Sequence, residues 1–183
     1  MTGKSTGMLA SVMAFAVYML TLCPTVYVEG SGELIGAVLG LGTPHPTGYP
    51  LFCLSGRLIS VILPFDRTAY EINIASAFFA AAACGTLAWL LRERGVQAWV
   101  ALTSALLFAF SRTFWSQAVV AEVYGQALCL VVLVIAMALR ASERQYPRDL
   151  LLLGWLMGLG LTAHLMQVLI WPGVVLLLIW RCP

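Results

Sequence analysis

Long apolar segments separated by short charged turns limit the fold of this chain more than any other feature. The apolar runs cover residues 8–26, 49–63, 68–91, 96–110, 115–139 and 150–180. Because an α-helix rises ~1.5 Å per residue, about 20 apolar residues are needed to cross the hydrocarbon core of a bilayer. Hydrophobic residues make up 61% of the chain and charged residues only 10%, which excludes an ordinary soluble domain. The sequence therefore predicts an all-α, multi-pass transmembrane bundle.

The lengths of the runs predict five to six membrane helices in a single transmembrane domain covering residues 1–183. The run 49–63 is short and interrupted by polar residues, so we expect a re-entrant or interfacial helix there. The run 150–180 is long enough for two short spans with a turn at residues 164–167, or for one kinked element. The sequence leaves both alternatives open.

The positions of the basic residues predict the orientation, because Lys and Arg are enriched on the cytoplasmic side of membrane proteins. A cytoplasmic N-terminus places seven basic residues inside: Lys4, Arg92, Arg94, Arg140, Arg144, Arg148 and Arg181. The outer side then holds Arg57, Arg67 and Arg112. We therefore expect an integral membrane protein, in the inner (cell) membrane if the source is bacterial, with the loop after the first run on the outer face. The basic residues form no patch, so nucleic acid is not an expected partner.

The loop 25–51 is rich in Gly and Pro and carries Glu29, Glu33 and His45. Ionisable groups beside a membrane span are costly, so each is a candidate for function. Either glutamate is a candidate proton acceptor. Alternatively, Glu33 lies in the first turn of a helix over residues 33–41, with Ser31 near its N-cap, where a carboxylate is favoured by the helix dipole. His45 lies between two prolines and either binds sugar or phosphate, carries a proton, or holds the loop in place through a hydrogen bond.

A second outer group contains Arg112, Gln117 and Glu122. The run 115–139 is expected to form one span, which places Glu122 about two turns into an apolar helix, where a charge needs a partner such as Arg112 or His164. The guanidinium of Arg112 suits a lipid phosphate, although an interfacial anchor is the plainer and slightly favoured explanation. His164 and Gln167 lie at the expected outer turn.

Four motifs occur in a fixed order along the chain. They are SGEL at 31–34, HPTGYPL at 45–51, SRTFWSQAVVAEVY at 111–124, and a Gly-rich run that ends at His164. Together they resemble domain-of-unknown-function family 2723, whose animal members are protein O-mannosyltransferases of the GT-C superfamily. The resemblance covers essentially the whole chain and corresponds to the N-terminal part of a larger GT-C module. The family's usual GDSGE pattern has Gly30 at the Asp position here.

The resemblance implies a GT-C-like bundle with short interfacial helices in the first outer loop. It also implies an enzyme that transfers a sugar, with mannose as the family's example, from a polyprenyl-phosphate carrier to a protein or glycan acceptor on the outer face. Such a reaction needs a base for the acceptor hydroxyl and donors for the departing phosphate. The expected catalytic residues are Glu33 and Glu29, and the expected substrate-binding residues are His45, Tyr49, Arg112, Gln117, Glu122 and His164.

No cofactor is expected, because the sequence contains no metal-binding motif; a divalent ion at Glu29 and Glu33 has no further support. The expected partners are membrane lipid, the lipid-linked donor, the acceptor and other membrane proteins. The alternative function is a catalytically silent subunit for membrane assembly or lipid binding, which Gly30 in place of Asp favours. A small transporter is disfavoured, because charges do not follow the spans as a pathway requires.

Overall fold

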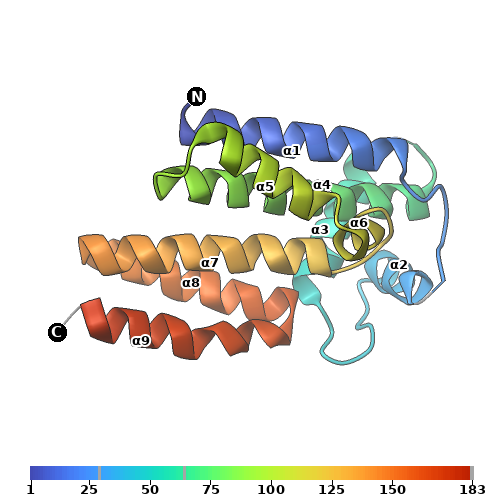
Figure 1. Cartoon of the computed structure of the whole chain (residues 1–183). Helices are drawn as coiled ribbons and strands as arrows, with labels where there is room; N and C mark the ends of the chain where they lie inside the picture. The colour runs from blue at the N-terminus through green and yellow to red at the C-terminus, as the bar shows by residue number, and fades with distance from the viewer. Residues whose placement is uncertain (29, 64, 182–183) are drawn as a thin grey trace.

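The computed structural model describes residues 1–28, 30–63 and 65–181, and all regular structure among them is helical (Figure 1). The elements are α1 (Gly3–Leu20), α2 (Ser31–Gly40), α3 (Pro50–Ile62), α4 (Thr68–Glu93), α5 (Ala98–Ala109), α6 (Arg112–Ala118), α7 (Tyr124–Arg144), α8 (Pro147–Ala163), the 3₁₀ helix η1 (Leu165–Ile170) and α9 (Trp171–Arg181). The predicted all-α membrane bundle is confirmed. Within the described ranges, α1, α4 and α7 are long and apolar enough to span a membrane. Counting α5 and α6, which are bent by 70°, as one span gives four, below the expected five to six.

Helix α4 is the centre of the bundle. It contacts α1, α5, α7 and α3, and α7 in turn contacts α8 and α9. Figure 1 shows the long helices side by side, with α2, α3 and α6 gathered at one end and both chain termini at the other. The polar loop that the sequence singled out is therefore held at the end of the bundle farthest from the termini.

Small residues let α1 and α4 pack closely. A Cβ atom added to Gly7 would lie 2.7 Å from the carbonyl oxygen of Gly85, and one added to Gly85 would overlap the Ser11 hydroxyl. The Ser11 Oγ donates a hydrogen bond to the Ala81 carbonyl oxygen at 3.1 Å. In a membrane, where apolar burial does not drive helix association, close backbone approach of this kind supplies the packing energy. Small side chains therefore fix how α1 lies on α4.

The end of the bundle that holds the termini is tied together by basic side chains. Arg92 donates a hydrogen bond to the Met1 carbonyl oxygen, and Arg94 forms an ion pair with Glu143. The side-chain amide of Gln145, just after α7, also donates to the carbonyl oxygen of Arg181 at the end of α9. Several of the basic residues assigned to the cytoplasmic side thus share one end. Which side of a membrane this end faces stays a prediction.

Two buried polar side chains of α4 hold the loops at the opposite end. Asn73 donates through Nδ2 to the carbonyl oxygens of Cys23, at 2.8 Å, and Thr25, at 3.1 Å. The Ser76 hydroxyl accepts from the Glu122 N–H at 3.0 Å and donates to the Glu122 carbonyl oxygen at 3.2 Å. Backbone groups that lack helical partners are therefore satisfied by the central helix.

The expected single span over 115–139 is wrong. Helix α6 ends at Ala118, and α7 begins only at Tyr124. The intervening loop is apolar because it is buried: Ala121 and Val123 are at most 3% exposed. Glu122 consequently lies in this loop, two residues before the start of α7, and not two turns into an apolar helix.

Other boundaries agree better with the sequence. The expected run 68–91 is α4, and the short run 49–63 forms the separate short helix α3. The first helix ends at Leu20, before Pro24, and does not reach residue 26. The run 150–180 is broken at His164, which adopts an extended conformation between α8 and η1, so the turn expected at residues 164–167 is present. Neither part is among the helices long and apolar enough to span a membrane, so the alternative of two short spans stays a prediction.

The same substitution at two glycines tests the packing of α1 on α4. Gly7→Ala places a methyl group against backbone and is expected to lower the free energy of unfolding by about 1–3 kcal/mol. Gly154→Ala, in α8, meets no atom within 4 Å and is expected to be neutral or stabilising by up to about 1 kcal/mol. Thermal unfolding in detergent micelles measures both. Equal effects of the two changes would contradict the close approach.

Candidate functional site

Helix α2 presents the first half of the site. It begins at Ser31 and ends at Gly40, close to the expected 33–41, but its N-cap is Gly30 and not Ser31. The Ser31 hydroxyl instead accepts a weak hydrogen bond from the Tyr27 N–H at 3.4 Å. Gly30 has φ +94°, a conformation that a side chain disfavours, although a Cβ there would meet no atom within 4 Å. Glu29, the other expected catalytic residue, lies outside the described residues.

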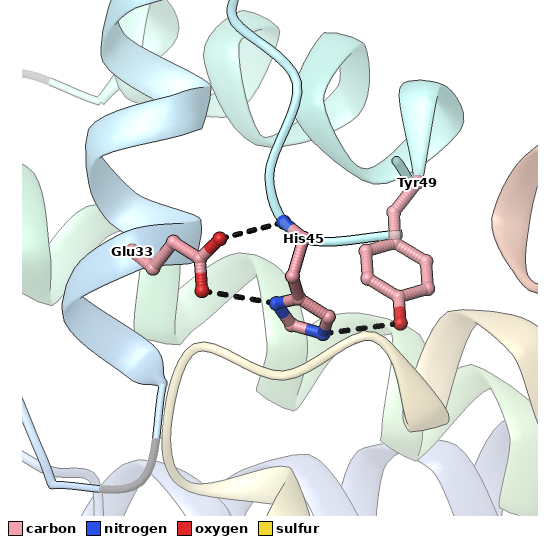
Figure 2. A network of polar contacts seen from close by, with 3 residues as sticks. All are labelled: Glu33, His45 and Tyr49. Atoms are coloured by element: carbon pink, nitrogen blue, oxygen red, sulfur yellow. Dashed lines mark hydrogen bonds and ion pairs between the residues drawn. The ribbon is translucent and has the colours of Figure 1, made fainter. Parts of the chain in front are cut away.

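Glu33 and His45 form a two-point contact across the loop (Figure 2). One carboxylate oxygen of Glu33 accepts from the His45 backbone N–H at 2.6 Å, and the other lies 3.0 Å from the imidazole Nδ1. Both side chains are about half exposed, at 48% and 49%. The hydrogen bonds from His45 hold the pKa of the Glu33 carboxyl below its ordinary value. The sequence prediction that these two residues belong to one loop site agrees with this geometry.

Tyr49 connects His45 to the interior. Its hydroxyl lies 3.2 Å from the Nε2 atom of His45, and the two rings meet edge to face with centroids 5.3 Å apart. Tyr49 itself is only 7% exposed and precedes α3, whose first residue is Pro50. Burial, together with the nearby Tyr124, Glu122 and Glu33, raises the pKa of the Tyr49 hydroxyl, so it stays protonated.

His164 and Tyr124 extend this group from the other half of the chain. The His164 ring lies 5.5 Å from the Tyr49 ring and 5.8 Å from the Tyr124 ring, centroid to centroid. His164 Nδ1 accepts from the Met166 N–H at 3.2 Å, and burial lowers the pKa of its imidazole. Sequence analysis included His164 but missed Tyr124, whose only clue was its place at the end of the 111–124 motif.

A small apolar core that includes Tyr49 packs against this aromatic group. It joins side chains of α2, α3, α4 and the loop before α7: Leu34, Ile35, Val38, Tyr49, Phe52, Cys53, Ile72, Ala121 and Val123. Because residues in well-packed cores occupy fixed positions, the residues on its surface are held in a defined arrangement. Tyr49 belongs to both the core and the polar group.

A cavity of about 600 Å³ opens beside α6; its lining is more apolar than polar, but it carries more polar groups than the neighbouring groove, and it is called the polar cavity for that reason. Its lining contains Gln117, Glu122 and Tyr124, together with Phe108, Ser111, Thr113 and Phe114. Arg112 is the first residue of α6, between two lining residues, and its own side chain is exposed. The structure thus brings Gln117 and Glu122 to one cavity and leaves Arg112 outside its lining.

An apolar groove of about 350 Å³ adjoins the polar cavity. Its lining residues are Phe114, Tyr124, Ala127, Leu128, Val131, His164, Met166 and Gln167. Phe114 and Tyr124 line both spaces. Gln167 is buried and donates through Nε2 to the Ala127 carbonyl oxygen at 3.0 Å, so it ties η1 to α7. A molecule with a polar head and an apolar chain matches the two adjoining spaces.

Within the part of the chain that the structure describes, no three His, Cys, Asp or Glu side chains lie close enough together to hold a metal ion. The contacts around Glu33 that the structure does show are hydrogen bonds from His45.

The lowered pKa of Glu33 predicts a pH-dependent loop. A carboxyl whose pKa is lowered by folding stabilises the folded state above its ordinary pKa, and this contribution is lost as the pH falls through the lowered value. We expect the exchange rate of the His45 backbone amide in Glu33→Gln, divided by the wild-type rate, to exceed one at neutral pH and to approach one in acid. Hydrogen exchange at each pH measures this ratio. A ratio that does not change with pH would contradict the contact.

Comparison with known proteins gives the family. A family model described as the protein O-mannosyl-transferase TMEM260 N-terminal domain matches residues 30–183. The protein O-mannosyl-transferase TMEM260 of Mus musculus is 37% identical over 146 residues, which are 79% of this chain and 20% of that protein. The corresponding protein of Dictyostelium discoideum is 32% identical over 116 residues, 60% of this chain and 14% of the relative. No solved structure matches significantly.

The chain therefore spans about a fifth or less of the length of these two relatives. The family match covers both histidines, both cavities and all the helices from α2 onward. The resemblance to O-mannosyltransferase-like membrane proteins that the motifs predicted is confirmed. This chain belongs to the TMEM260 N-terminal domain family of protein O-mannosyl-transferases.

Proposed function

We propose that this protein is a GT-C-type membrane glycosyltransferase. It moves a sugar, mannose by analogy with the names of its relatives, from a polyprenyl-phosphate carrier to a hydroxyl of a protein or glycan acceptor on the outer face. The observation that supports the proposal best is the polar cavity and the apolar groove that share Phe114 and Tyr124. A lipid-linked sugar has the same division between a polar head and an apolar chain.

The polar cavity is suited to the head of such a donor. Gln117 supplies an amide, and Ser111 and Thr113 supply hydroxyls that hydrogen-bond to sugar or phosphate oxygens. Arg112, exposed at the start of the same helix, supplies a guanidinium whose planar fork pairs with phosphate oxygens. Donors and a cation near the departing phosphate stabilise the charge that develops as the bond to the sugar breaks.

The apolar groove is suited to the first isoprenoid units of the carrier. Leu128, Val131 and Met166 supply side chains without charge, and the groove lies between α6, α7 and η1. Lipid tails and these side chains are equally apolar, so moving the isoprenoid chain from the bilayer into the groove removes no apolar surface from water. Van der Waals packing against the groove therefore determines how tightly the isoprenoid chain binds. The Glu33–His45 pair, across Tyr49 from His164, supplies the group that takes the acceptor proton.

Narrowing the groove tests this function directly. Leu128→Trp is expected to lower kcat/KM for a long-chain polyprenyl-phosphate mannose by about tenfold or more, the effect of a few lost apolar contacts. A donor with a short isoprenoid chain should be affected less, since it occupies less of the groove. Radiolabelled sugar transfer, measured with the protein in bilayers, gives both values.

The matched control is Leu151→Trp on the exposed face of α8, where the side chain is 75% exposed and lines neither space. Transfer by this variant should equal that of the wild type. Equal losses for long and short donors would contradict the groove assignment. If the wild type binds the lipid but transfers no sugar, the catalytically silent, lipid-binding alternative is correct.

A further inference from the structure

We propose that His45 is the catalytic base of this site and that Glu33 is the residue that positions it. The inference rests on the proposed sugar transfer and assigns the proton to the imidazole and not to a carboxylate. The geometry behind it is the chain of contacts from Glu33 through His45 to Tyr49 in Figure 2.

Glu33 is poorly placed to be the base itself. Both of its carboxylate oxygens already accept hydrogen bonds from His45, one from the backbone N–H and one from the ring. A proton taken from an acceptor would have to bind the remaining lone pair of an oxygen that already accepts a hydrogen bond from His45. The same two bonds lower the pKa of the carboxyl, which weakens it as a proton acceptor.

The carboxylate instead determines which nitrogen of His45 is free. An ionised carboxylate only accepts hydrogen bonds, so the neutral imidazole must carry its proton on Nδ1, facing Glu33. Nε2 is then the atom with the lone pair, and the protonated Tyr49 hydroxyl donates to it at 3.2 Å. A hydrogen bond to one ring nitrogen that fixes the tautomer of a histidine is a recurrent feature of enzymes.

The exposure of the side chains shows which residue in the series Glu33, His45 and Tyr49 an acceptor can reach. The His45 side chain is 49% exposed, whereas Tyr49 is 7% exposed. An acceptor hydroxyl that arrives from the outer solvent therefore meets the His45 side chain before Tyr49, and in the proposed step it replaces the Tyr49 hydroxyl at Nε2. Tyr49 in turn contacts His164, which lines the groove, so the base stands two ring contacts from the proposed donor site.

The proton and electron pairs balance in this scheme. The acceptor oxygen forms a bond to the anomeric carbon of the sugar as the bond from that carbon to the lipid phosphate oxygen breaks, and the phosphate keeps the electron pair. The acceptor proton passes to Nε2 of His45. The Glu33 carboxylate stabilises the resulting imidazolium, and the proton later leaves to the phosphate product or to water.

The protonation of His45 provides a test that does not depend on catalysis. The chain has two histidines, so ¹⁵N NMR of the labelled protein gives two imidazoles, and His45→Gln identifies which is which. In the neutral form, His45 is expected to carry its proton on Nδ1, and Glu33→Ala should shift the population toward Nε2–H. A wild-type His45 protonated on Nε2 would overturn the proposal.

The second test compares transfer rates. We expect His45→Gln to lower kcat by ~10²- to 10⁴-fold with little change in the donor KM. Glu33→Gln should lower kcat less, and the double variant should be no worse than His45→Gln alone, because Glu33 acts through His45. The control is Glu143→Gln, which removes a similarly exposed, hydrogen-bonded carboxylate at the other end of the bundle and should leave kcat unchanged.

The outcomes separate the two proposals. A loss in Glu33→Gln as large as or larger than that in His45→Gln makes Glu33 the base and overturns the assignment of His45. Absence of transfer by the wild type overturns the proposed function and, with it, the catalytic role of His45. Wild-type transfer with the expected order of variants and Nδ1 protonation supports both.

Discussion

The hydrogen bonds from Asn73 and Ser76 to loop backbone are the interactions on which the site depends. Asn73 holds the chain that leaves α1, and Ser76 holds the chain that enters α7. Both side chains come from one face of one helix, so two loops some hundred residues apart are fixed to a common support. Without these bonds, partly buried backbone groups of both loops would lose these partners, at a cost of about 0.5–1.5 kcal/mol each.

This support explains why the polar groups meet at one end of the bundle. The loop after α1 leads into α2 and the Glu33–His45 contact, and the loop before α7 carries Glu122 and leads into Tyr124. Tyr49 and His164 complete the connection through ring contacts. The Glu33–His45 contact and the spaces proposed for the donor are therefore arranged by the same central helix.

The sequence predicted the helical class and half of the site because these depend on local patterns. The isolated glutamate and histidine of the Gly- and Pro-rich loop were conspicuous, and a turn at residues 164–167 was one of two alternatives for the last apolar run. The loop at Val119–Val123 was missed because buried apolar residues look the same in a loop as in a span. Tyr124 was missed because an aromatic residue at a helix start is common at membrane interfaces.

The backbone at Gly30 has a consequence for attempts to alter this site. With φ +94°, the position is strained for any residue with a side chain, at a cost of about 1–3 kcal/mol. An aspartate introduced there would find open space but would also push the start of α2 toward a different conformation. Since Glu33 lies in the first turn of that helix, such a change would redirect the existing carboxylate while adding a new one. The backbone conformation at residue 30, more than the added charge, therefore determines the effect of introducing a second acidic residue into this loop.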